Sequence, residues 1–187
     1  MTVRAAERAT RADLEALPSS VAGELIRGVL YAMPRPRPRD QRATGRLFSD
    51  LEGPFDRAGG ERGGWVILVE PGIALPAVDV DELSPDIAGW RRERLPELPD
   101  SLIDVVPDWV CEVLSPSTRA HDQRVKRPLY AQAGVAWMWV VDVDARTVVV
   151  SQNESGRWLE VAVYANTEPM AAQPFESHTI QLGDLWG

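Results

Sequence analysis

The 187-residue sequence contains one cysteine, Cys111, and two histidines, His121 and His178. A single cysteine cannot form an internal disulfide bond, and these three residues lack the short spacings of a zinc site built from cysteine and histidine. We therefore expect no disulfide partner and no structural zinc. Cys111 stands in an apolar segment and is expected to belong to the core. The histidines are expected to lie on the surface or to form local hydrogen bonds, and for His121 a place near the predicted site stays open.

Long apolar segments are also missing. No run approaches the roughly 20 apolar residues that span a bilayer, and the first twenty residues, MTVRAAERATRADLEALPSS, have no apolar core of a signal peptide. We therefore expect a cytoplasmic protein without membrane contact. With 44% hydrophobic and 26% charged residues, the composition is that of a globular domain.

A net positive charge is absent too, since the formal charge is −8. This value argues against broad electrostatic binding to nucleic acid, which depends on neutralising phosphates. The segment RPRPRDQRATGR is a local exception, with five arginines against one acid, Asp40. It is either a solvated loop or a source of phosphate contacts, and the candidate contacts are Arg35, Arg37, Arg39 and Arg42.

The apolar and turn residues predict one α/β domain with a mixed, mostly antiparallel central sheet flanked by helices. Helices are expected over residues 10–17, 43–55 and 118–133, the second ending near Gly59-Gly60 and the third at Gly134. A hairpin is expected over 24–33, and strands over 65–75, 84–90, 108–114, 136–143, 146–153 and 157–164, with the acidic stretch 78–83 as a connection. Residues 1–19 are expected to form a helical lead-in and residues 20–187 the domain.

One carboxylate stands inside the most apolar predicted strand, because Glu112 lies in the middle of DWVCEVL. A lone buried carboxylate is costly, so Glu112 needs a cation, a metal ion or a raised pKa. A structural salt bridge to an arginine and a metal-binding role both remain open. Asp86 is the best candidate for a second, converging acid, although a Pro-Asp pair before a strand also serves simply to begin that strand.

Lysine is nearly absent, since Lys126 is the only one in the chain. Two acids at a strand end raise each other's pKa, and a hard divalent cation such as Mg²⁺ or Mn²⁺ removes that repulsion. A lysine nearby would add a fixed positive charge for a phosphodiester under attack. These residue types suggest a catalytic set of Asp86, Glu112 and Lys126.

The segments ELIRGVL, SPDIAGW, EVLSPSTRAHDQRVKRPLYAQAGV and IQLGDLW follow one another in this sequence. In this order they resemble the Uma family of restriction-endonuclease-like proteins, formerly a domain of unknown function, over about residues 20–187. The resemblance implies the PD-(D/E)XK nuclease fold, DNA as partner, and Mg²⁺ or Mn²⁺ held by Asp86 and Glu112. The standard motif would place its lysine at Leu114, whereas Lys126 matches the family's position on the following helix. Glu24 matches an accessory acid.

Three further positions bear on that resemblance. Where family members commonly have a histidine, this sequence has Asp40, followed by Gln41 as a second accessory candidate. Tyr130 matches a family position and is expected to pack. Pro128 would distort a continuous helix, which leaves open whether Lys126 reaches Glu112.

We expect from these features a metal-dependent endonuclease that hydrolyses DNA phosphodiester bonds with metal-activated water. One alternative is an inactive module of the same fold that binds nucleic acid or a protein. Another is a structural protein in which Glu112 is a salt-bridged core acid. The apolar segment RWLEVAVY, at a predicted sheet edge, is compatible with a homodimer.

Overall fold

A six-stranded mixed sheet forms the centre of the computed structural model, which describes residues 8–57 and 64–187. Its strand order is β10-β9-β8-β7-β6-β3. The strands are β3 (Trp65–Val69), β6 (Ile87–Arg91), β7 (Trp109–Leu114), β8 (Trp137–Asp142), β9 (Thr147–Glu154) and β10 (Arg157–Ala165). β7 and β8 run parallel and the other neighbouring pairs run antiparallel, so the expected mixed, mostly antiparallel sheet is confirmed.

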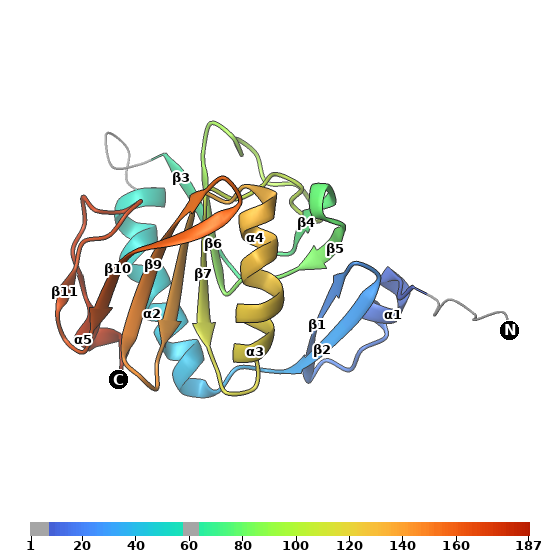
Figure 1. Ribbon diagram of the computed structural model, residues 1–187, viewed down its shortest axis with the longest axis horizontal. Coiled ribbons are helices and arrows are strands. Elements are labelled where there is room, and N and C mark those ends of the chain that lie inside the picture. Colours follow the sequence, from blue (N-terminus) through green and yellow to red (C-terminus); the bar gives the residue numbers. More distant parts are fainter. Residues whose placement is uncertain (1–7, 58–63) are drawn as a thin grey trace, which may run out of the picture.

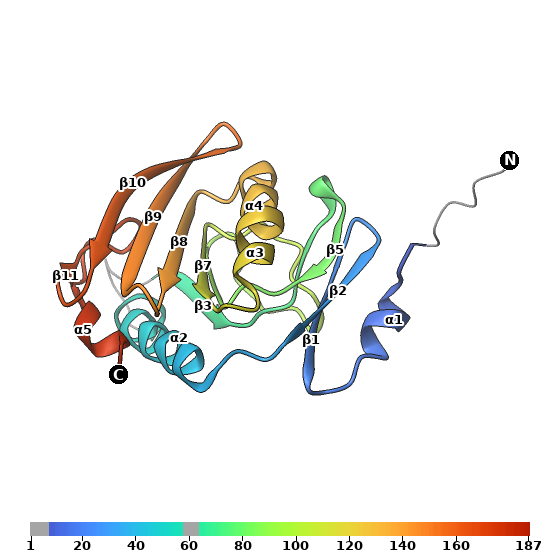
Figure 2. The same ribbon diagram turned by 60° about the horizontal axis from the view of Figure 1, so that its bottom comes forward.

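Helices cover both faces of this sheet (Figures 1 and 2). On one face lies α2 (Pro38–Leu51), continued by a π-helical turn at Glu52–Arg57. Its predicted apolar stripe is buried as expected, and the stripe consists of Ala43, Leu47, Leu51 and Phe55. The other face carries α3 (Arg119–His121), a π-helical turn (Asp122–Lys126) and α4 (Arg127–Ala133). The predicted end of the first long helix near Gly59-Gly60 lies outside the described residues.

Strand β7 is buried along its whole length, as expected for a central strand covered on both faces. Successive side chains point to opposite faces of a sheet. Trp109, Cys111 and Val113 accordingly belong to the hydrophobic cluster under α2, whereas Val110 and Leu114 belong to the cluster under α4. The same alternation directs the side chain at position 112 towards α3 and α4, which form the crossover between the parallel strands β7 and β8.

A second sheet of four strands lies beside the first. Its presence shows that two predictions, on the hairpin and on residues 78–83, need correction. Its order is β2-β1-β5-β4, formed by β1 (Val21–Ile26), β2 (Val29–Pro34), β4 (Ile73–Leu75) and β5 (Val80–Leu83). The predicted hairpin is present, but it belongs to this small sheet and not to a single central one. The acidic stretch 78–83 was expected to be a connection, and most of it is β5, because Val80 and Leu83 bury their side chains while Asp81 stays exposed.

The remaining elements are short. α1 (Arg11–Glu15) begins after Thr10, whose backbone N–H donates to the Asp13 carboxylate at 2.7 Å, as the predicted capping pair requires. β11 (Pro169–Met170), β12 (Ile180–Gln181) and α5 (Leu182–Leu185) close the side of the molecule that carries α2. The division into a lead-in of residues 1–19 and a domain of residues 20–187 stays a prediction.

The structure also bears on the predicted core cysteine, on membrane contact and on the predicted homodimer. Cys111 is fully buried, which confirms its predicted core role. In the described part of the chain, no helix combines the length and the apolar character needed to cross a bilayer. β10 forms one edge of the main sheet, and its pairing with β9 shifts register between Glu160 and Ala162. A bulge of this kind hinders edge-to-edge pairing, and the homodimer stays a prediction.

Candidate active site

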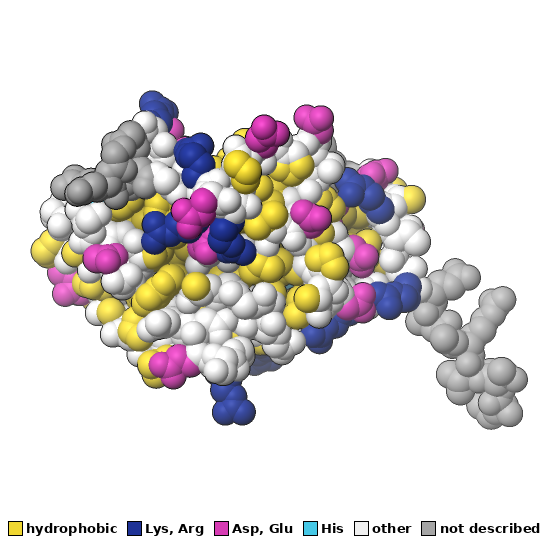
Figure 3. Space-filling model, turned by 90° about the horizontal axis from the view of Figure 1, so that it is seen from above, with side chains coloured by type: hydrophobic (Ala, Val, Ile, Leu, Met, Phe, Trp, Pro, Cys, Tyr) yellow, Lys and Arg dark blue, Asp and Glu magenta, His cyan; other side chains and the backbone are white. Residues whose placement is uncertain are grey.

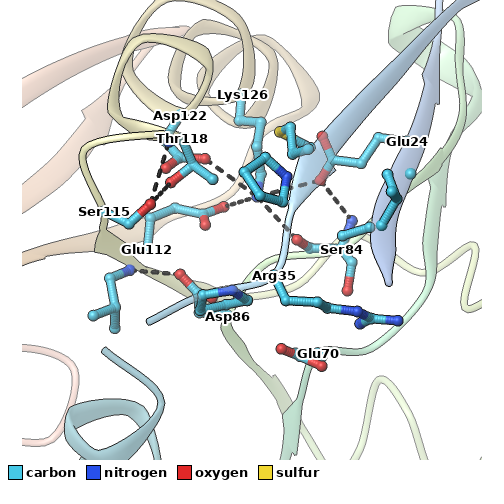
Figure 4. Close-up of a pocket in the computed structure, with 17 residues that line it drawn as sticks. Glu24, Arg35, Glu70, Ser84, Asp86, Glu112, Ser115, Thr118, Asp122 and Lys126 are labelled. Atoms are coloured by element: carbon cyan, nitrogen blue, oxygen red, sulfur yellow. Dashed lines mark hydrogen bonds and ion pairs between the residues drawn. The ribbon is translucent and has the colours of Figure 1, made fainter. Parts of the chain in front are cut away.

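A cavity of about 290 Å³ lies between the small sheet, the ends of β6 and β7, and the crossover helices. Five carboxylates line it against two cations, Lys126 and Arg35 (Figure 4). The acids are Glu24, Glu70, Asp86, Glu112 and Asp122. An excess of negative charge in a partly enclosed site attracts cations and repels an unaccompanied phosphate.

Glu112 enters this cavity from β7 and is only 1% exposed. Its Oε1 accepts a hydrogen bond from the Tyr130 hydroxyl at 2.6 Å and lies 2.8 Å from the Lys126 Nζ. Burial raises the pKa of the Glu112 carboxyl well above its usual range, and the charge of Lys126 offsets part of that rise. The cation that the buried acid requires is therefore Lys126, and not an arginine as the salt-bridge interpretation supposed.

Asp86 reaches the same point from the start of β6. Because β6 and β7 are antiparallel, with Ile87 opposite Cys111, the beginning of β6 lies beside the end of β7. Asp86 Oδ2 accepts the backbone N–H of Val113 at 2.6 Å. Burial raises the pKa of Asp86 to about 6, although Lys126 and the Val113 N–H act in the opposite direction. The two acids predicted to converge therefore line the same cavity.

Lys126 completes the predicted set, and Pro128 does not prevent it. Pro128 has no N–H to donate, and the preceding residue, Arg127, donates its own N–H to Asp122, five positions back, in a π-helical turn. The helix thus continues past the proline with the lysine side chain directed at Glu112. Burial lowers the pKa of Lys126, but the carboxylates of Glu112 and Glu24 raise it more, so the residue remains an ammonium.

Glu24 also lies in the site, as the resemblance implied. It comes from β1 in the small sheet and is 3% exposed. Its Oε1 accepts the Ser84 N–H at 3.1 Å and lies 3.3 Å from Lys126 Nζ, and its Oε2 lies 2.6 Å from His121 Nε2. Burial alone would raise the pKa of Glu24, but Lys126 and the hydrogen bond from His121 outweigh it and lower the pKa. Glu24 is therefore ionised, and His121 acts as its donor.

For three other side chains in or beside the cavity, the sequence predicted either no role or a different role from the one that the structure shows. Tyr130 was expected only to pack, yet its buried hydroxyl donates to Glu112. Asp122 lies 3.7 Å from Lys126 Nζ, one helical turn before it, and that spacing on a predicted helix could have identified it. Glu70 follows β3 and lies below Asp86 in Figure 4, and no local pattern marks it in the sequence.

The four arginines predicted to contact phosphate are not equivalent. Arg35 lines the cavity and donates to the Ser19 carbonyl at 3.2 Å. Arg37 is bound to Asp40 and Asp144, and Arg39 pairs with Asp144. Two of the four are thereby neutralised by acids. Arg42 is exposed.

Asp40, at the position where the resemblance implied a histidine, and Gln41, which follows it, have different surroundings. Asp40 is 1% exposed and bound by Arg37 at 2.7 Å, so it stabilises the first turn of α2 and does not face the site. Gln41 lines a smaller cavity of about 170 Å³ together with Glu70 and Asp86. Of the two, only Gln41 is placed to act near Asp86.

The donor set suits a hard divalent cation. Asp86 Oδ1 and Glu112 Oε2 have no hydrogen-bond partner within residues 8–57 and 64–187, while the second oxygen of each is held by the protein. Over the same ranges, no group of three or more histidine, cysteine, aspartate or glutamate side chains is gathered around one point. Mg²⁺ is often held by one or two carboxylates, with water and substrate oxygens completing its shell. The two acids therefore fit Mg²⁺ or Mn²⁺.

Comparison with known proteins gives a family model and a similar structure. The model named Uma2, described as "Putative restriction endonuclease", matches residues 11–183. A crystal structure from Anabaena variabilis ATCC 29413, described as "a putative nuclease belonging to DUF820", is similar with a TM-score of 0.72 and 20% sequence identity. The similarity covers 94% of this chain and 96% of that one, and it confirms the expected fold. No curated protein matches the chain.

Proposed function

Because the chain belongs to the Uma2 family, as its sequence motifs indicated, we propose that it is an endonuclease that hydrolyses DNA phosphodiester bonds with a divalent cation. The observation that carries this proposal is the convergence of Asp86, Glu112 and Lys126 in one cavity. Asp86 directly precedes β6, Glu112 lies on the antiparallel strand β7 and Lys126 lies in the crossover. Among the described residues, 8–57 and 64–187, one oxygen of each acid has no hydrogen-bond partner.

Asp86 and Glu112 would hold the cation. When bound, Mg²⁺ or Mn²⁺ supplies activation of the attacking water and neutralisation of charge on the phosphodiester. The chain itself supplies a rigid frame, because the Val113 N–H and the Tyr130 hydroxyl each fix one carboxylate. Without a cation, the carboxylates of this cavity would repel the substrate.

Lys126 has an electrostatic role in this proposal. Its ammonium is held by neighbouring carboxylates and stays charged, so it does not accept a proton from water. A fixed positive charge at this position stabilises the negative charge that builds up on a phosphodiester under attack. Lys126 is thus proposed to orient the reacting groups and to stabilise the transition state.

Arg35 is proposed as the first phosphate contact beside the cavity, with Arg42 as a second. Figure 3 shows basic and acidic side chains interspersed over one face of the molecule, and the net charge is −8. Binding is therefore expected to rest on a few local contacts and not on a broad cationic surface.

Metal binding can be tested without measuring cleavage. Mn²⁺ is expected to raise the melting temperature of the wild type, because a ligand bound only by the native state stabilises it. At a hundred times its dissociation constant the gain is about 2.7 kcal/mol, and each kcal/mol corresponds to roughly 2–4 °C for a chain of this size. Asp86→Asn is expected to abolish the shift in a thermal denaturation series.

The matched control for that series is Asp81→Asn, since Asp81 is an exposed acid on β5 away from the cavity. It should respond to Mn²⁺ as the wild type does. A wild-type melting temperature that is indifferent to both Mg²⁺ and Mn²⁺ would contradict the assignment of Asp86 and Glu112 as metal ligands.

The role of Arg35 predicts a change in the salt dependence of DNA binding. Arg35→Ala is expected to weaken binding and to reduce the slope of log K against log salt by about 0.9, the value for one phosphate contact. Fluorescence anisotropy with a labelled duplex, with Ca²⁺ in place of Mg²⁺, measures this slope. Arg94→Ala, which removes an arginine paired with Asp108, is the control and should leave the slope unchanged. Equal slopes for wild type and Arg35→Ala would remove Arg35 from the interface.

A further inference from the structure

The Lys126 ammonium already contacts a proposed metal ligand, Glu112, at the carboxylate oxygen that Tyr130 also holds. Its Nζ lies 2.8 Å from Glu112 Oε1, 2.9 Å from the Ser84 carbonyl oxygen and 3.3 Å from Glu24 Oε1. The contact with the Ser84 carbonyl oxygen is a hydrogen bond, and the contacts with the two carboxylates are ion pairs, so the ammonium is surrounded by acceptors. The side chain is 5% exposed, which leaves it little freedom to turn to solvent instead.

A divalent cation at Asp86 and Glu112 would lie close to this ammonium. Two cations beside one buried carboxylate repel each other, and the repulsion is strong because the site is shielded from water. Lys126 therefore needs a second acceptor that can hold it once its interaction with Glu112 weakens. Such an acceptor would have to lie on the side of the Lys126 Nζ that faces away from Glu112.

Glu24 has the required position and is held in place. It belongs to β1 in the small sheet, whereas Glu112 belongs to β7 in the main sheet, and Lys126 lies between them (Figure 4). The Ser84 N–H fixes Oε1 of Glu24 at 3.1 Å, and His121 fixes Oε2 at 2.6 Å. The His121 ring in turn packs on Tyr31, with ring centroids 4.6 Å apart. Glu24 is thus an ionised acceptor whose orientation does not depend on Lys126.

We propose that Lys126 neutralises the Glu112 carboxylate while no divalent cation is bound, and that Glu24, oriented by His121, receives the ammonium when the cation binds. This inference rests on the proposed function and names what regulates its metal site. Glu24 and His121 are then positioning residues that act through Lys126. The small sheet contributes to the site by supplying Glu24.

A double-mutant cycle on Mn²⁺ affinity tests the proposal. Isothermal titration calorimetry would compare the wild type, Glu24→Gln, Lys126→Gln and the double variant. We expect Glu24→Gln to weaken Mn²⁺ binding about tenfold, as is common for residues that support metal ligands. Lys126→Gln should bind Mn²⁺ at least as tightly as the wild type, because the competing ammonium is gone. In that background, Glu24→Gln should change the affinity by less than about twofold, since coupled residues are not additive.

Each other outcome has a distinct meaning. A wild type that binds no Mn²⁺ refutes the metal site of the proposed function itself. If Glu24→Gln weakens binding equally in both backgrounds, Glu24 acts through its charge alone and the exchange of Lys126 is wrong. Tenfold weaker binding by Lys126→Gln would show that the ammonium does not compete. Glu82→Gln, on the neighbouring strand β5, is the matched control and should leave the affinity unchanged.

A pair of variants at His121 keeps the test independent of the folding of Glu24→Gln. His121→Gln retains a side-chain N–H that can donate to Glu24, whereas His121→Leu does not. We expect wild-type Mn²⁺ affinity for His121→Gln and weaker binding for His121→Leu, with circular dichroism to confirm that both are folded. Equal Mn²⁺ affinity in the two variants would overturn the positioning role of His121.

Discussion

Glu112→Gln is expected to lower the rate of plasmid nicking by more than about a hundredfold. Glutamine has nearly the same shape as glutamate, and its carbonyl oxygen can still accept from the Tyr130 hydroxyl and from Lys126, which hold Glu112 now. Its amide nitrogen cannot bind a cation. Lys126 keeps the carboxylates of Glu24 and Asp122 nearby, so its charge stays compensated and the fold is expected to survive.

The measurement is nicking of supercoiled plasmid with Mg²⁺, with Mn²⁺ and with a chelator. Wild type and Glu82→Gln should nick at equal rates with metal, and neither should nick with the chelator. If Glu112→Gln nicks as fast as the wild type, the activity does not reside in this cavity. If the wild type binds DNA but never nicks with any metal, the chain is the inactive binding module that the sequence left as an alternative.

Lys126→Met is expected to give the largest loss of stability, about 3–5 kcal/mol without metal. Removing one partner of a buried ion pair leaves uncompensated charge, and losses of that size are typical. Here Glu24 and Glu112, which are 3% and 1% exposed, would both lose their cation. Mn²⁺ should restore part of the stability by supplying positive charge at Glu112, whereas activity should stay low because the fixed ammonium is missing.

Urea denaturation with and without Mn²⁺ measures this effect. The stabilisation by Mn²⁺ should be larger for Lys126→Met than for the wild type, because no ammonium opposes the cation. Arg94→Ala removes a surface ion pair and provides the control, with a loss of no more than about 1 kcal/mol. A Lys126→Met protein that is as stable as the wild type would show that the buried acids do not depend on the lysine.

Local sequence patterns were enough to predict the central part of the site. The apolar run around Glu112 could only be a buried strand, and a carboxylate in such a strand requires a partner. The Pro-Asp pair before another apolar run placed Asp86 at a strand start, and antiparallel pairing of the two strands then brought the acids together. Lys126 was identified as a candidate because it is the only lysine in the sequence and because it matches the family's position on the following helix.

The resemblance implied Glu24 as an accessory acid, but the sequence could not predict its contacts with His121 and Lys126. His121 and Glu24 are 97 residues apart and belong to different layers of the fold. The polar role of Tyr130 was missed because a buried aromatic ring and a buried hydroxyl donor have the same sequence pattern. The separate small sheet was missed because β5 is short and acidic, with only two buried residues to indicate a strand.

By itself, then, the sequence determined the fold class, because alternating burial and turn residues act over short distances along the chain, and its motif order indicated the family and the three residues proposed for catalysis. Only the tertiary structure decided that Lys126 reaches Glu112 past Pro128, through a π-helical turn. It also decided that Arg37 and Arg39 are neutralised while Arg35 lines the cavity. These outcomes depend on distances between side chains from remote segments, and such distances are set by how the two sheets and the crossover helix pack together.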